Sequence, residues 1–131
     1  MQKFLTAYFT IAVVFLGLDL IWIGVVMKDF YRSQIGALML ETPDLPVAIA
    51  FYLIYVAGIV IFSVLPAGSW KKAAILGAMF GFFTYATYDL TNLATLKGWT
   101  TTVALADMGW GAFSTCVAAC LGYAAASRFA K

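Results

Sequence analysis

Three aspartates lie within strongly apolar stretches of the sequence or at their edges: Asp19, Asp89 and Asp107. A bilayer penalises ionised side chains, so acids in such segments usually face other protein groups and often bind protons or ligands. Three carboxylates close together in a medium of low dielectric constant cannot all stay ionised, because repulsion and desolvation favour protonation. We therefore expect a shared proton, unless a cation lies among the acids.

Lys28, Arg32 and Lys97 are the candidate internal counter-ions. A hard cation held by the carboxylates, the amide oxygen of Asn92 and backbone carbonyls is the other option. The spacing matches no metal motif, and the chain contains no histidine, which removes the usual zinc and haem ligand sets and the commonest general base. We predict no metal site and no cofactor.

Aromatic and polar side chains share helix faces with these acids. Tyr85, Asp89 and Asn92 stand at i, i+4 and i+7, so we expect them to hydrogen-bond along one face. Trp22, three residues after Asp19, shares a helix face with it. The candidate residues for ligand binding or proton relay are Asp19, Trp22, Arg32, Tyr52, Tyr55, Tyr85, Tyr88, Asp89, Asn92, Lys97, Asp107 and Trp110. No catalytic residue is identified.

The composition indicates one integral membrane domain, residues 1–131, of all-α class. Of the 131 residues, 64% are hydrophobic and 11% charged, and a soluble domain of this length could not bury so much apolar surface. The net charge of +2 is too small and scattered to suggest nucleic acid. Four apolar segments, at about 4–27, 47–65, 73–93 and 103–127, are each near or above the roughly 20 residues that span a bilayer core.

The segment between the first two spans contains apolar residues at helical spacing. It predicts a short amphipathic helix in the membrane interface, with Asp29 as its cap, and a plain loop is the alternative. The first span is too long for a signal peptide and carries Asp19 and Trp22, so it should remain as a membrane helix.

The charges of the connecting segments favour both termini in the cytoplasm, since five basic residues lie on the side of the termini and three on the other. With four spans in this orientation, the three membrane acids lie at similar depth. They predict a carboxylate and aromatic pocket on the non-cytoplasmic side. The alternative is that the acids cap helix ends and bridge helices structurally.

Small residues predict where helices pack closely. Gly77 and Gly81 form a small-xxx-small pair in the third span. On the first span, Gly17 and Gly24 belong to a stripe opposite Asp19, which suggests a central helix or a homodimer. Cys116 and Cys120 are expected to pack as small apolar residues, and Trp70 and Trp99 to belong to an aromatic belt at the membrane surfaces.

The runs Leu18–Trp22, Phe51–Tyr55 and Tyr85–Thr95, together with Phe30–Arg32, Leu65–Ala67 and Asp107–Gly111, resemble a bacterial family of small four-span membrane proteins. That family is known as domain-of-unknown-function family 2177. The likeness extends over nearly the whole chain. It implies an integral protein of the inner membrane in Gram-negative bacteria, working alongside enzymes that modify membrane fatty acids. It brings no established catalytic residue.

Three functions remain open. The first is binding or transport of a small or lipidic ligand with proton coupling, by analogy with small multidrug exporters. The second is an enzyme, or the accessory subunit of an enzyme, that modifies membrane lipids. The third is a structural scaffold. Expected partners are the bilayer, a small-molecule or lipid ligand and a second copy of the chain.

Overall fold

The chain folds into a bundle of long helices, as the all-α class predicts, and residues 1–130, which the computed structural model describes, contain no β-strand. The elements in chain order are α1 (Gln2–Ile21), the π-helical turn η1 (Trp22–Val26), α2 (Lys28–Ile35), the 3-10 turn η2 (Gly36–Leu38), α3 (Leu45–Ile59), the π-helical turn η3 (Val60–Val64), α4 (Trp70–Thr95) and α5 (Thr101–Phe129).

The three later long helices begin at side-chain caps. The side chains of Asp44, Ser69 and Thr100 accept hydrogen bonds from the backbone N–H groups three residues ahead and so satisfy one of the free donors of each helix. The short helix predicted after the first span is present as α2, but no side chain caps it. The prediction that Asp29 is its cap is wrong, because the helix already begins at Lys28.

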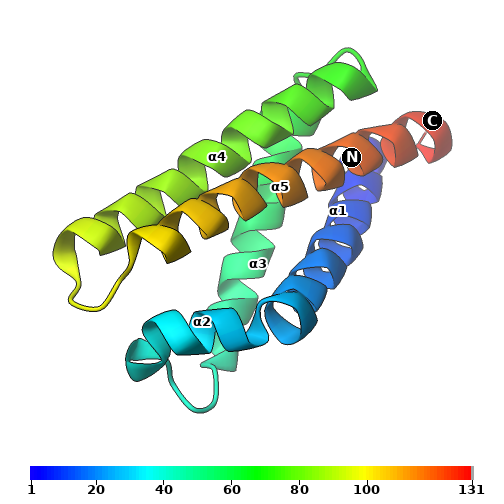
Figure 1. The fold of residues 1–131 in the computed structure, drawn as a ribbon. Helices are drawn as coiled ribbons and strands as arrows, with labels where there is room; N and C mark the ends of the chain where they lie inside the picture. Colours follow the sequence, from blue (N-terminus) through cyan, green and yellow to red (C-terminus); the bar gives the residue numbers. More distant parts are fainter. Residues whose placement is uncertain (131) are drawn as a thin grey trace.

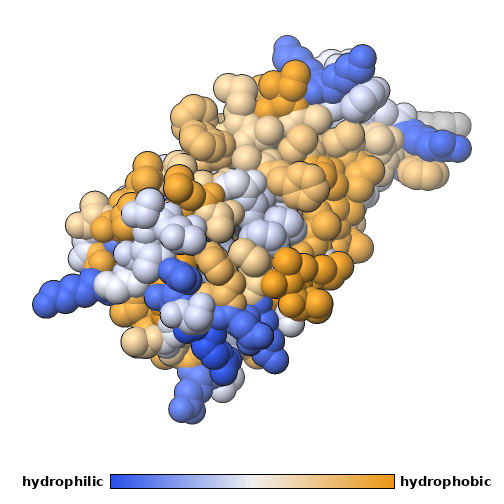
Figure 2. Space-filling model, in the orientation of Figure 1, coloured by the Kyte–Doolittle hydropathy of each residue, from blue (hydrophilic) through white to orange (hydrophobic). Residues whose placement is uncertain are grey.

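Three helical segments are long and apolar enough to cross a membrane: Gln2–Val26, Leu45–Val64 and Thr101–Phe129. Helix α4 is 26 residues long but does not join them, so the prediction of four spans is not confirmed. Its hydropathy is lowered by Lys71, Lys72 and the polar run 84–95. Figure 2 shows the most hydrophilic residues gathered at the two ends of the molecule, with apolar residues over much of the zone between them.

Helices α4 and α5 lie antiparallel along most of their lengths (Figure 1). They approach closely because glycines face the contact: a Cβ at Gly81 would collide with the backbone of Gly111, and one at Gly77 with the Ala119 side chain. The small-xxx-small prediction is thus correct. By contrast, a Cβ at Gly17 of α1 or at Gly24 of η1 would have no atom of another described element within 4 Å, so no other part of residues 1–130 packs closely against these two glycines.

The core lies where α1, α3 with η3, and α5 meet. Phe15, Ile11 and Ile59 are among its largest completely buried side chains. Figure 1 places both termini at one end of the bundle, with α2 and the α4–α5 loop at the other. In that loop Gly98 has a φ of +87°, a left-handed conformation that glycine adopts at low cost. Cys116 and Cys120 are free thiols of intermediate burial.

Candidate functional site

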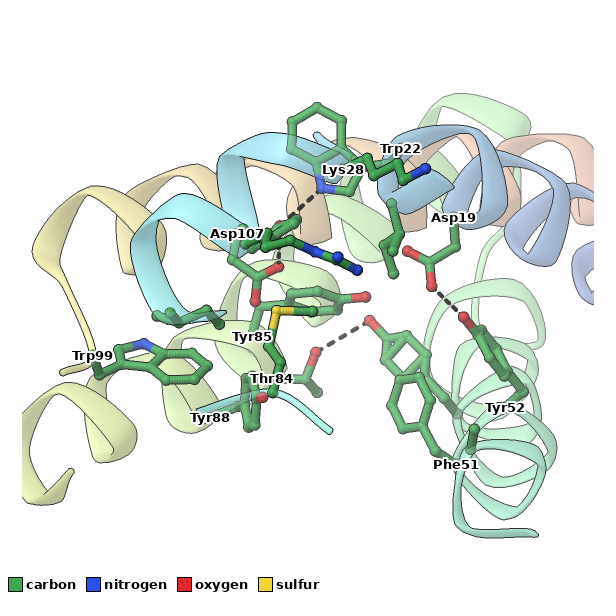
Figure 3. Close-up of a pocket in the computed structure, with 17 residues that line it drawn as sticks. Asp19, Trp22, Lys28, Phe51, Tyr52, Thr84, Tyr85, Tyr88, Trp99 and Asp107 are labelled. Carbon is green, nitrogen blue, oxygen red and sulfur yellow. Dashed lines mark hydrogen bonds between the residues drawn. The ribbon is translucent and has the colours of Figure 1, made fainter. Parts of the chain in front are cut away.

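A cavity of about 620 Å³ lies at the end of the bundle that carries α2 and the α4–α5 loop (Figure 3). Side chains from α1, η1, α2, α3, α4 and α5 line it, together with Trp99 of the α4–α5 loop. Of the twelve residues predicted from the sequence, eight line this cavity: Asp19, Trp22, Arg32, Tyr52, Tyr55, Tyr85, Tyr88 and Asp107. The structure therefore brings most of the predicted residues to one cavity.

The other four predicted residues lie outside the cavity lining: Asp89, Asn92, Lys97 and Trp110. Asp89 is buried in the α4–α5 contact, Asn92 is half-buried one turn further along α4, and Lys97 is exposed in the loop. Within the described residues, no hydrogen bond joins Tyr85, Asp89 and Asn92, so that expectation is wrong. Spacing on a helix brings side chains to one face, but the neighbouring helix decides which groups they meet.

Asp19 is held by two neutral donors from different helices. The Tyr52 hydroxyl of α3 donates to its Oδ2, and the Trp110 Nε1–H of α5 donates to its Oδ1 at 3.1 Å. The Asp19 residue is only 6% exposed. Hydrogen bonds to an ionised carboxylate stabilise the charged form and offset part of the cost of burial. Asp19 thus ties α1, α3 and α5 together at the inner wall of the cavity.

Tyr31 of α2 connects Asp107 to Trp22. Its hydroxyl donates to Asp107 Oδ1 at 2.9 Å and accepts from Trp22 Nε1 at 2.9 Å. The Trp22 ring in turn stacks on Trp110, with centroids 4.3 Å apart and planes 4° from parallel. Burial, with the nearby Asp107 carboxylate, raises the pKa of Tyr31 far above its ordinary value. The hydroxyl therefore remains a donor at any ordinary pH.

Asp89 is completely buried, with an exposed fraction of 0%. Within residues 1–130, no N–H or O–H group donates to either of its carboxylate oxygens. Its neighbour across the helix contact is another acid, because the register of α4 and α5 at Gly77 and Gly81 places Asp107 opposite Asp89. Such a pair is unusual, since buried polar groups in folded proteins nearly always have a partner.

Two basic side chains of α2, Lys28 and Arg32, line the cavity on its exposed side. The hydrogen bonds described for the carboxylates of Asp19 and Asp107 come from tyrosine and tryptophan, and none comes from a lysine or arginine. The two cations are therefore not consumed by ion pairing with these acids in residues 1–130. Lys97, the third predicted counter-ion, lies away from the cavity.

Sequence reasoning overlooked several residues of the site. Tyr31 is not among the residues predicted for the site, although a hydroxyl among the apolar residues of the predicted interfacial helix is itself a signal of a buried polar partner. Trp99 was assigned to the aromatic belt, yet it lines the cavity, contacts Tyr88 edge-on and buries an Nε1–H that has no acceptor within the described residues. Phe51 and Thr84 also line the cavity.

An apolar groove of about 390 Å³ adjoins the cavity between α3 and α4. The two spaces share Phe51, Tyr55 and Thr84 as lining residues. At the floor of the groove, the Tyr55 ring stacks on Phe80 at 5.5 Å, and the Tyr55 hydroxyl bonds the hydroxyls of Thr84 (3.1 Å) and Thr115 (2.8 Å). The groove begins beside the charged cavity and continues along α3 towards η3.

The cavity is lined by groups of the kinds that contact ligands and exchange protons in proteins. Residues 1–130 contain no group of three or more side chains suited to hold a metal ion. The lining combines aromatic rings with two carboxylates and two cations, and cavities of this size and character commonly bind small molecules.

Comparison with known proteins gives one match. No curated protein and no solved structure matches the chain. The model of one protein family matches residues 4–124, which is nearly the whole sequence. The chain belongs to this family, whose description is "Predicted membrane protein (DUF2177)".

Proposed function

We propose that this protein is a four-span protein of the bacterial inner membrane that binds a small or lipidic ligand in the cavity, with proton coupling through its membrane aspartates. Both termini lie in the cytoplasm in this proposal, and the cavity faces the other side. Helix α4 acts as the fourth span. Its 26 residues extend over about 39 Å, enough to cross a hydrocarbon core of about 30 Å, and it packs along α5, itself a candidate span.

The observation that carries the proposal is the continuity between the cavity and the apolar groove. A groove between α3 and α4 at membrane depth faces lipid chains rather than water. Ile54 and Phe62, which line it, are 73% and 61% exposed and are therefore available to a chain lying there. A lipidic ligand fits this arrangement, with its polar head in the cavity and its chain along α3.

The charges of the cavity favour an anionic or zwitterionic head group. Both carboxylate oxygens of Asp19 already accept hydrogen bonds, from Tyr52 and Trp110. Lys28 and Arg32 line the same cavity and donate to neither Asp19 nor Asp107 within the described residues. A phosphate or carboxylate matches the geometry of a guanidinium well. The neighbouring rings of Phe51 and Tyr88 supply apolar contact beside it.

Quenching of tryptophan fluorescence by a brominated fatty acid tests the proposal. Trp22 and Trp99 line the cavity and Trp110 stacks on Trp22, whereas Trp70 begins α4 at the opposite end. We expect saturable quenching in detergent micelles that the unbrominated fatty acid reverses. The Trp70→Phe variant should retain the quenching, and the double variant Trp22→Phe, Trp99→Phe should lose most of it. Quenching that neither saturates nor responds to competition would contradict the proposal.

Transport and catalysis are separate extensions of binding. Proton-driven flux in proteoliposomes that depends on the aspartates would establish transport, and its absence under every gradient would limit the protein to binding.

The groove between α3 and α4 equally suits an enzyme of lipid modification or its accessory subunit. In that case Asp89→Asn should change the lipid profile of a complemented deletion strain. A scaffold would show effects on stability alone.

A homodimer would use the glycine stripe of α1. Within residues 1–130, a Cβ at Gly17 or Gly24 would meet no other element within 4 Å, so a second copy of the first span has room to approach them closely.

A further inference from the structure

We infer that Asp89 and Asp107 form a proton-binding pair, in which a neutral Asp89 donates its carboxyl proton to an ionised Asp107. This site concerns two of the three membrane acids only. It rests on the contact between α4 and α5, and it holds whether or not the cavity binds a lipid.

The register of the two helices brings these residues together. Gly77 faces Thr115 and Ala119, Gly81 faces Gly111 and Thr115, and Tyr85 faces Gly111, so each turn along α4 meets the preceding turn of α5. One more turn places Asp89 opposite Asp107. The close backbone approach at the glycines leaves no room for a large side chain or a solvent layer between the helices.

The pair lacks a hydrogen-bond donor for Asp89 within the described residues. Asp89 has an exposed fraction of 0%, and neither of its oxygens receives a donor from residues 1–130. An ionised carboxylate without donors, inside an apolar bundle, would cost several kcal/mol or more. Protonation of Asp89 removes its negative charge and also supplies the hydrogen bond that it lacks, because the carboxylic O–H of Asp89 can donate to Asp107.

The groups around the pair agree with this assignment. Tyr31 of α2 already donates to Asp107 Oδ1, which supports the negative charge on Asp107 rather than on Asp89. The other titratable or charged groups near the pair are Asp19 of α1, Lys28 and Arg32 of α2, Tyr52 and Tyr55 of α3, and Tyr85 and Tyr88 of α4. Within the described residues, none of these donates a hydrogen bond to Asp89.

A metal ion is the competing occupant of two facing carboxylates. A hard divalent cation needs six or more oxygen ligands, or several retained waters, and a completely buried Asp89 leaves no space for them. Residues 1–130 also hold no cluster of three or more metal-ligating side chains. A proton needs only the two carboxyl groups.

Infrared spectroscopy of the purified protein tests the inference, because the C=O stretch of a protonated carboxylic acid is separate from the bands of carboxylates. At neutral pH we expect one protonated carboxyl per chain. The band should vanish in Asp89→Asn, where the amide donates to Asp107 instead. It should persist, shifted, in Asp107→Asn, and remain unchanged in Asp19→Asn, the matched control.

Absence of a protonated carboxyl band in the wild-type protein at neutral pH would overturn the inference. A band that persists in Asp89→Asn would also overturn it. Alkaline titration of the wild type gives a second measurement if a variant does not fold. Removal of the shared proton brings two negative charges together, so the thermal unfolding temperature should fall as the band disappears. A band that titrates without any change in unfolding temperature would contradict a shared proton.

Discussion

At the scale of single residues, the three aspartates Asp19, Asp89 and Asp107 differ in the hydrogen bonds that their carboxyl groups accept. Asp19 accepts hydrogen bonds from two neutral donors, and Asp107 accepts one from the Tyr31 hydroxyl. Asp89 accepts no hydrogen bond from residues 1–130. Chemically identical side chains thus reach different states because different helices face them. Tyr31 is central to this arrangement, since it is the group through which α2 contacts both Asp107 and Trp22.

We predict that Tyr31→Phe loosens α2 from the bundle. The change leaves Trp22 Nε1 without its acceptor and Asp107 Oδ1 without its donor, at a cost of about 1–3 kcal/mol. Hydrogen–deuterium exchange of residues 28–35 should therefore increase. Because burial raises the pKa of Tyr31, the wild-type contact is present at acidic and neutral pH and is lost only in strong alkali.

Tyr8→Phe is the matched control for Tyr31→Phe. It removes a hydroxyl that bonds the Leu53 carbonyl at 3.0 Å, away from the cavity. Exchange of residues 28–35 should be unchanged in this variant. Equal exchange of α2 in the wild type and in Tyr31→Phe would show that the hydroxyl does not hold α2.

At the scale of elements, α4 and α5 share the most extensive helix–helix contact of the described residues, and α2 lies along the exposed side of the cavity. The pair depends on glycines that admit the opposite backbone, as Gly81 does against Gly111. The Tyr85 ring lies against Gly111 on one side and lines the cavity on the other. The same close packing therefore positions both the cavity wall and the Asp89–Asp107 pair.

We predict that Gly81→Ala destabilises the protein by about 1–3 kcal/mol, because its Cβ would collide with the Gly111 carbonyl and force the helices apart. The control is Gly109→Ala, in α5, where the added Cβ would meet no atom within 4 Å. This change should be neutral or stabilising by up to about 1 kcal/mol. Thermal unfolding in one detergent compares the two variants. Similar stability in both would show that α4 and α5 can separate at little cost.

At the scale of the whole molecule, the question is how the bundle lies in the bilayer. Large apolar side chains are exposed along every long helix, α4 included: Ile75 and Phe83 of α4 are each 61% exposed. In water such a surface would favour aggregation, whereas in a bilayer it meets lipid chains. The most hydrophilic residues lie at the two ends (Figure 2).

Cysteine labelling tests the fourth span directly. In a background without Cys116 and Cys120, we predict that Lys97→Cys reacts with a membrane-impermeant maleimide in intact spheroplasts, whereas Lys71→Cys reacts only after lysis. Both positions are exposed in the structure, so burial cannot explain a difference. Labelling of both from the same side would show that α4 does not cross the membrane.

Patterns in the sequence predict the helical class, the approximate bounds of the long helices and eight of the residues that line the cavity. These follow from local quantities: apolar length, helical period and the depth at which each acid enters a span. The packing of the helices is needed to see that Asp89 lies opposite Asp107, that Tyr52 and Trp110 donate hydrogen bonds to Asp19, and that Tyr31 and Trp99 line the cavity. Depth and face are properties of one helix, whereas a hydrogen-bond partner depends on how several helices are rotated and spaced, and one sequence read helix by helix contains no measure of that.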